Sequence, residues 1–136
     1  MIWDTGPLYA AFDRDDKHHA ASAALMLATA PPLLVPAPVM VEVCYHLQKH
    51  LGARAEIAFL RAVQRGQLRL LAPEPEDFER AVELVEQYQG FPLGVVDAHV
   101  MAIAERMNVT QIASTDHRHF RAVKLRHCDG LTLLPS

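Results

Sequence analysis

The sequence predicts an α/β domain with a central, mostly parallel sheet of about four to five short strands flanked by helices. Short apolar runs of three or four residues recur along the chain, and longer segments with apolar residues at helical spacing lie between them. The 136 residues, of which 51% are hydrophobic and 21% charged, also have the size and composition of one globular unit. We therefore expect residues 1–136 to form a single domain.

Each predicted strand is a short apolar run beside residues that favour turns. The first run stops at Asp4, and the following Thr5-Gly6-Pro7 predicts a turn. The fourth run leads directly into Thr115 and Asp116. The predicted strands are residues 1–3, 33–35, 68–71, 111–114 and 131–134.

The predicted helices are Ala-rich or apolar at every third or fourth position, and several end at glycine or proline. Pro38 suits the first turn of a helix that runs through Glu42 to about His50. Asp97 lies in the first turn of the last predicted helix. The predicted helices are residues 8–12, 17–30, 38–50, 53–65, 75–89 and 96–107.

Four acidic residues stand where a ligand site of such a fold is expected. Open α/β sheets bind ligands beyond the carboxyl ends of their strands, and Asp4 and Asp116 each follow a predicted strand. Asp97 and Glu42 can lean over the same edge from their helices. Carboxylates this close repel one another, and Mg²⁺ or Mn²⁺ relieves that repulsion because both ions prefer oxygen ligands. Such ions also accept substrate phosphate oxygens and activate water for phosphodiester cleavage.

Each acid also has a purely structural explanation. Asp4 suits a turn, and Asp116 suits a loop. Asp97 can cap its helix or interact with the helix dipole, and Glu42 can lie on a solvated helix face. The local pattern leaves both explanations open for all four residues.

Taken in order, these residues resemble a PIN domain, and more narrowly a ribonuclease toxin of the VapC type. The resemblance covers essentially the whole chain and includes the spacing of the four acids. The matching segments are IWDTGPLYAAFDRDDKHHAA, VPAPVMVEVCYHL, GVVDAHVMAIAERMNV and QIASTDHRHFRAV.

The resemblance implies a PIN-like three-layer fold and an endoribonuclease that depends on Mg²⁺ or Mn²⁺. It assigns metal binding and catalysis to Asp4, Glu42, Asp97 and Asp116, with supporting hydroxyl groups nearby. It also implies a homodimer and a small antitoxin that blocks the site. The supporting hydroxyl groups belong to Thr5 and Thr115.

One segment departs from the family pattern. Some members carry a further acid shortly after the fourth, whereas this chain has His117-Arg118-His119 there. That difference weakens the case for a full second metal site.

Residues 117–127 are basic and stand next to the predicted site. They contain four Lys or Arg residues, three histidines and no acid, which favours contact with a phosphate backbone. A solvated loop and edge strand explain the segment equally well. The residues that we expect to contact RNA are Arg14, Arg118, His119 and Arg121.

Paired histidines raise the alternative of a zinc site. His46 and His50 are four residues apart on a predicted helix, a spacing that can chelate a metal. Two further pairs are His18-His19 and His117/His119. Without a third ligand at a matching spacing, ordinary surface or core histidines are the favoured interpretation.

Charge and cysteine content indicate the cellular compartment but do not identify the activity. Without the four site acids, 12 acids remain against 13 bases, so the net charge of −3 does not exclude a nucleic-acid substrate. Two cysteines without a CxxC pair favour a reducing compartment. No apolar run is long enough to span a membrane, and no secretion signal precedes the first strand. We expect a cytoplasmic protein.

Two alternatives stay open beside a metal-dependent endoribonuclease toxin. The first is a PIN scaffold that binds RNA or a protein partner without cutting, which the missing further acid favours. The second is an aspartyl-phosphate enzyme or receiver domain with Asp4 as the nucleophile. That alternative requires a lysine at the end of a later strand, and Lys124 is poorly placed for the role.

Overall fold

Five short strands form one parallel sheet in the computed structural model, which describes residues 1–136. The order across the sheet is β3-β2-β1-β4-β5, and every neighbouring pair is parallel. Ile2 in the central strand is in register with Leu34 on one side and Ile112 on the other. The predicted mostly parallel sheet is therefore confirmed. The strands are β1 (Ile2–Trp3), β2 (Leu33–Pro36), β3 (Leu68–Leu71), β4 (Gln111–Ala113) and β5 (Thr132–Leu134).

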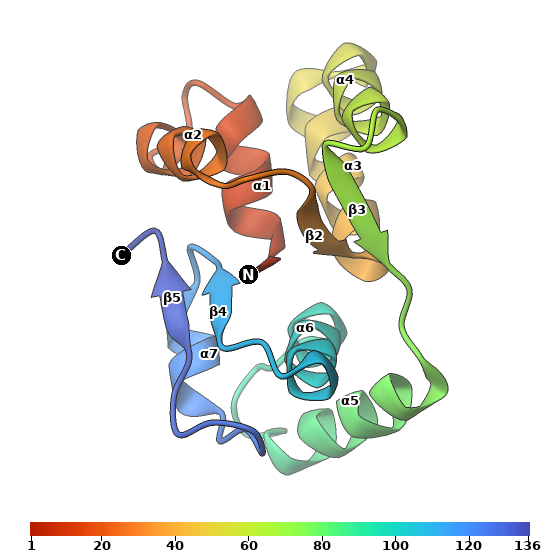
Figure 1. Cartoon of the computed structure of the whole chain (residues 1–136), viewed down its shortest axis with the longest axis vertical. Helices are drawn as coiled ribbons and strands as arrows, with labels where there is room; N and C mark the ends of the chain where they lie inside the picture. The colour runs from red at the N-terminus through yellow and green to blue at the C-terminus, as the bar shows by residue number, and fades with distance from the viewer.

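Seven helices flank the sheet. Figure 1 shows α1 to α4 gathered at the top of the view and α5 and α6 at the bottom, with the strands between the two groups. The helices are α1 (Thr5–Phe12), α2 (His19–Ala28), α3 (Ala37–Leu51), α4 (Ala53–Gln64), α5 (Pro75–Gln87), α6 (Val95–Met107) and α7 (His117–Ala122).

The first helix begins three residues earlier than the sequence predicts. Thr5, Gly6 and Pro7 form its first turn, and Asp4 occupies the N-cap position. The prediction of a turn there was wrong because proline is compatible with the first turn of a helix, where backbone N–H groups have no intrahelical partner. Asp4 therefore stands at the junction between β1 and α1.

The short helix α7 was not predicted at all. Its six residues follow Asp116 at the N-cap, and only Phe120 among them is buried. A single turn and a half gives no repeated apolar period, so the sequence offered only a loop and an edge strand here. The helix matters because it turns His119 back towards Asp116.

Helix α6, which carries Asp97, is buried on all sides for most of its length. Every residue from Ala98 to Ala104 is buried, whereas apolar residues at every third or fourth position predicted burial of one face only. Helices with apolar residues all round are enclosed by other elements, and here α5 covers α6 on one side. Two ion pairs join α5 to α6: Arg106 Nε lies 3.0 Å from Asp77 Oδ1, and Arg80 Nε lies 2.7 Å from Glu105 Oε1.

A continuous apolar core holds these layers together. It includes buried side chains from all five strands and from every helix except α2. Trp3, Ile2 and Ile112 in the two central strands are fully buried, so the strand ends that lead into the acidic residues are fixed by packing. None of the helices is both long and apolar enough to pass through a lipid bilayer.

Candidate active site

The site lies where the strand order reverses. From β1 the chain passes outwards to β2 and β3, whereas β4 and β5 lie on the other side of β1. Such a reversal opens a crevice beyond the carboxyl ends of the two central strands. Asp4 follows β1, and its backbone N–H donates a hydrogen bond of 2.8 Å to the carbonyl oxygen of Ala113 at the end of β4.

All four predicted acids line one cavity at this crevice. The cavity has a volume of about 480 Å³, and its ten lining residues also include both predicted threonines. The sequence-based prediction that residues far apart in the chain meet in one pocket is therefore matched by the geometry. The lining residues are Asp4, Thr5, Gly6, Glu42, Gly94, Val95, Val96, Asp97, Thr115 and Asp116.

Asp4 is the most buried of the acids. Its carboxylate accepts a hydrogen bond of 2.9 Å from the hydroxyl group of Ser114, and only 5% of the residue is exposed. Burial, together with the nearby charge of Asp97, raises the pKa of Asp4 to about 7. Near neutral pH this carboxyl group is thus poised between its protonated and ionised forms unless a cation stabilises the charge.

Asp97 shares the same pocket from the first turn of α6. Burial raises the pKa of Asp97 to about 6, and Asp116 and Glu42 add to the increase while His119 opposes it. The ionised carboxylates of Asp116 and Glu42 oppose ionisation of Asp97 because like charges in one pocket repel.

Ser114 is a site residue that the sequence analysis missed. It is fully buried, and its hydroxyl group donates to Asp4 while accepting a hydrogen bond of 3.1 Å from the backbone N–H of Asp116. The side chain thereby fixes Asp4 relative to the start of α7. Its position directly after a strand and before Thr115-Asp116 was the only signal in the sequence.

His119 lies among the acids. Its Nδ1 atom is 2.5 Å from Asp116 Oδ2 and 3.3 Å from Asp97 Oδ2. The spacing of three residues between Asp116 and His119 places both on one face of a helix, but that signal is usable only once α7 is known to be helical. Asp97, Asp116 and His119 are the one group of three potential metal ligands in the structure whose ligand atoms all lie within 4.8 Å of one another.

The two threonines and Gly6 close the pocket on the side of α1. Thr5 is buried, and its hydroxyl oxygen has no hydrogen-bond partner. A Cβ atom on Gly6 would collide with the hydroxyl group of Thr115, so glycine permits α1 to start directly against the segment that follows β4.

The predicted RNA-contacting residues have different surroundings. Arg14 and Arg121 are exposed, whereas the guanidinium group of Arg118 lies 5.2 Å from the centroid of the Phe91 ring. Further along the basic segment, Arg126 Nη2 is 2.8 Å from Glu83 Oε2 and is thus engaged with α5.

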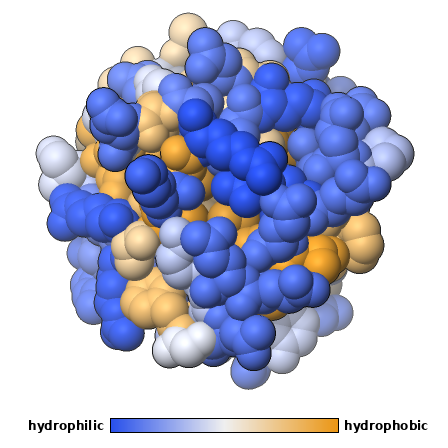
Figure 2. All heavy atoms as spheres, turned by 90° about the horizontal axis from the view of Figure 1, so that it is seen from below, coloured by the Kyte–Doolittle hydropathy of each residue, from blue (hydrophilic) through white to orange (hydrophobic).

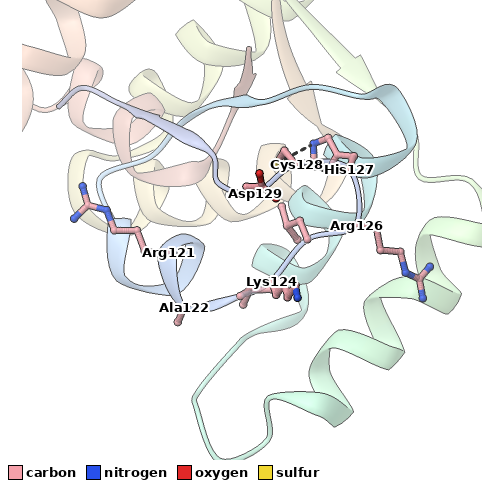
Figure 3. A pocket seen from close by; sticks show the side chains of 9 residues that line it. Arg121, Ala122, Lys124, Arg126, His127, Cys128 and Asp129 are labelled. Carbon is pink, nitrogen blue, oxygen red and sulfur yellow. Dashed lines mark hydrogen bonds between the residues drawn. The ribbon is translucent and has the colours of Figure 1, made fainter.

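Residues 121–129 instead surround a separate cavity of about 570 Å³. Figure 3 shows Arg121 and Arg126 at opposite ends of it, pointing away from each other. Lys124 also lines this cavity and not the one that holds Asp4. It is therefore not placed to act as the lysine that a receiver domain needs.

The pairs His46/His50 and His18-His19 do not build a zinc site. The rings of His46 and His50 stack with centroids 6.0 Å apart, and Tyr9 contacts both rings edge-on. No third ligand converges on them. His19 is occupied locally, because its Nδ1 atom lies 2.7 Å from the carbonyl oxygen of Ala10.

The chemistry of the pocket fits a hard divalent cation. It offers several carboxylate oxygens, two carboxyl groups that burial keeps from ionising freely, and a buried hydroxyl oxygen without a partner. Oxygen donors of this kind are the preferred ligands of Mg²⁺ and Mn²⁺.

Comparison with known proteins decides the family. The family model of the PIN domain matches residues 1–125, which is most of the chain. The chain belongs to the PIN-domain family. This PIN domain is 32% identical over 135 residues to Ribonuclease VapC26 of Mycobacterium tuberculosis (strain ATCC 25618 / H37Rv), with 99% of this chain and 100% of that protein covered.

Solved structures support the same fold for this PIN domain. The crystal structure of VapC20 from Mycobacterium tuberculosis, described as a toxin that cleaves the sarcin-ricin loop, gives a TM-score of 0.82 at 20% identity, covering 94% of this chain and 98% of that one. A toxin–antitoxin complex from Klebsiella pneumoniae gives a TM-score of 0.68 at 18% identity, covering 90% and 91%. The predicted PIN-like fold is thereby confirmed.

Proposed function

We propose that this PIN domain is an endoribonuclease that depends on Mg²⁺ or Mn²⁺ and acts as the toxin of a toxin–antitoxin pair. The observation that carries the proposal is the convergence of Asp4, Glu42, Asp97 and Asp116 on one cavity at the point where strand order reverses. The identity to a VapC ribonuclease along the whole chain supports the same activity.

Asp4 and Asp97 would hold the main divalent ion, and Glu42 and Asp116 would complete the cluster or bind its waters. When bound, the ion supplies an activated water and stabilises the charge on the leaving oxygen of the phosphodiester. Ser114 keeps the Asp4 carboxylate in place, and burial of Asp4 excludes bulk water from that side of the pocket. The hydroxyl groups of Thr5 and Thr115 would support the substrate or the waters.

A groove of about 610 Å³ adjoins the acid cavity, and its lining includes Asp13, Asp15 and Asp16, which would repel RNA phosphates. It shares Thr5, Gly6 and Thr115 with the acid cavity and extends to Lys17 and His50. Backbone phosphates beside the acid cavity would contact Arg14 on the side of α1. Arg118, His119 and Arg121 would contact phosphates on the side of α7.

An antitoxin and a second copy of the chain are the proposed protein partners, in a cytoplasmic setting. Several large apolar side chains are exposed on α3, α4 and α5, including Val41, Ile57 and Phe78. Figure 2 looks onto the lower end of the molecule and shows hydrophilic side chains with apolar ones exposed between them. Exposed apolar side chains that form a contiguous patch are typical of protein interfaces.

Cleavage of RNA by the purified chain tests the proposal. We expect cleavage in the presence of Mg²⁺ or Mn²⁺ and none after EDTA is added. Asp4→Asn and Asp97→Asn should each abolish cleavage without lowering thermal stability, whereas Asp129→Asn, on the exposed loop after α7, should cleave like the unchanged chain. Cleavage that persists in EDTA would contradict the mechanism.

A PIN scaffold that binds RNA without cutting it is a second candidate. The observation that favours it is that His119, rather than a further carboxylate, lies beside Asp97 and Asp116. Calorimetric titration with Mn²⁺ and RNA separates the two functions. RNA binding without metal binding or cleavage would favour the scaffold.

A further inference from the structure

We propose that Nδ1 of His119 is a metal ligand together with carboxylate oxygens of Asp97 and Asp116, so that this PIN domain has a mixed nitrogen and oxygen site that prefers Mn²⁺ to Mg²⁺. The inference rests on the proposed function, because it takes the acid cavity to be a divalent-ion site. It adds a ligand outside the four carboxylates and a choice of ion.

The three ligand atoms lie close enough together to share one octahedral ion. With bonds of about 2.1 Å, neighbouring ligand atoms of such an ion stand about 3.0 Å apart and opposite ones about 4.2 Å apart. Nδ1 of His119 lies 3.3 Å from Asp97 Oδ2, near the neighbouring spacing, and all three atoms fall within 4.8 Å of one another. The distance of 2.5 Å from Nδ1 to Asp116 Oδ2 is shorter, so these two atoms would move apart by about 0.5 Å when an ion binds between them.

The orientation of the ring also differs from that of a simple hydrogen bond. Nδ1 of His119 is buried and close to Asp116, yet no hydrogen bond of acceptable geometry joins it to any partner. A hydrogen bond requires the N–H to point at the acceptor. Ligand atoms of a shared ion are instead close together while each is aimed at the ion and not at its neighbour.

Packing holds the ring in this orientation. The edge of the His119 ring meets the Phe91 ring at an interplanar angle of 80°, with centroids 5.1 Å apart. Arg118 covers Phe91 as well. Fixing a ligand ring in advance lowers the entropy lost on binding, which favours occupation of the site.

A second observation points to a ligand in the same cavity. Thr5 is more than nine-tenths buried there, and its hydroxyl oxygen is unpartnered. An imidazole nitrogen then affects which ion is chosen. Mg²⁺ keeps to oxygen ligands and water, whereas later first-row ions accept imidazole readily and Mn²⁺ accepts both kinds of ligand.

Pulsed electron paramagnetic resonance of the Mn²⁺-loaded protein tests the ligand directly. We expect the spin-echo envelope to show modulation from a directly bound ¹⁴N nucleus. That modulation should disappear in His119→Gln and in His119→Asp and persist in His50→Gln, the matched control at an exposed position of α3. His119→Gln should also weaken Mn²⁺ binding in calorimetry by about tenfold or more.

The outcomes separate this inference from the proposed function. If Mn²⁺ binds and Asp97→Asn abolishes that binding, but no ¹⁴N modulation is seen or it survives in both His119 variants, the histidine ligand is wrong and the nuclease site stands. Tighter Mn²⁺ binding by His119→Gln would show that the ring competes with the ion and would also overturn the inference. If the unchanged chain binds no Mn²⁺, both proposals fail.

Discussion

Burial of the Asp4 carboxyl group opposes its ionisation, because the low-dielectric interior stabilises a charge less well than water does. The hydrogen bonds from the backbone N–H of Thr5 and the hydroxyl group of Ser114 offset part of this effect but do not cancel it. The folded state therefore favours the neutral, protonated form of Asp4, whereas the proposed chemistry requires the ionised form. A bound cation reconciles the two.

This conflict predicts an unusual dependence of stability on pH for the metal-free protein. The pKa of Asp4 is about 7 in the folded state and near 3.8 in the unfolded chain, so between pH 4 and pH 7 the folded state binds more protons. The free energy of unfolding should therefore fall as pH rises through this range, by about 2–3 kcal/mol from Asp4 between pH 5 and pH 8. Urea denaturation in EDTA at both pH values measures it.

Asp4→Asn provides the comparison for that measurement. The amide cannot ionise, so the variant should show a flatter pH profile and should be more stable than the unchanged chain at pH 8. Asp15→Asn, on an exposed loop, should keep the original profile. If the free energy of unfolding of the unchanged chain rises from pH 5 to pH 8, the raised pKa of Asp4 is contradicted.

The sequence was informative about the acids and less so about their neighbours. Asp4 and Asp116 could be placed because each follows an apolar run, and the rule for parallel sheets brings such positions to one edge. Ser114 and His119 could not be assigned their roles, since serine is common after strands and histidine is common in basic segments. Their roles depend on hydrogen bonds and distances that only the folded chain defines.

At the level of elements, the spacing of apolar residues predicted the long helix α5 and missed the short helix α7. Helix α5 was predicted within two residues at its end because its apolar positions repeat over more than three turns. Helix α7 has six residues and one buried side chain, so no period could appear. Its absence from the prediction hid the connection between His119 and the acids.

Helix α6 positions Asp97, and its ion pairs with α5 hold it in place. Asp77 is buried, and Arg106 Nε donates to both of its carboxylate oxygens, at 3.0 and 3.1 Å. Arg106→Gln should lower the free energy of unfolding by about 1–3 kcal/mol, because a buried carboxylate loses its charged partner. Arg54→Gln, at an exposed position of α4 without an ion pair, should change it by less than about 0.5 kcal/mol.

Chemical denaturation monitored by the fluorescence of the single tryptophan, Trp3, measures both variants. Trp3 is fully buried in the central strand next to Asp4, so its emission reports loss of the core. Equal midpoints for the two variants would show that the pair between α5 and α6 contributes nothing measurable. That result would leave apolar packing and the Arg80–Glu105 ion pair to position Asp97.

At the scale of the whole molecule, the proposed site joins residues from the N-terminal and the C-terminal halves of the chain. Asp4 and Glu42 come from the segment that builds β1 to β3, whereas Asp97 and Asp116 come from the segment that builds β4 and β5. An ion bound by both groups would link the two halves of the sheet across the point where their order reverses. Binding of the ion should therefore stabilise the entire chain against unfolding.

This link predicts that divalent ions raise the thermal stability of the protein. An ion that binds only the folded state adds about 2.7 kcal/mol at a hundred times its dissociation constant, which corresponds to a rise of roughly 10 °C in melting temperature for a chain of this size. The rise should depend on ion concentration, reverse with EDTA, and be larger at pH 8 than at pH 5, where protons compete for Asp4 and Asp97. Calorimetry of the unchanged chain and of Asp97→Asn, with and without Mn²⁺, measures each dependence. An equal rise in Asp97→Asn would mean that the ion stabilises the molecule from some other place, and the acid cavity would then not be the site that unites the two halves of the sheet.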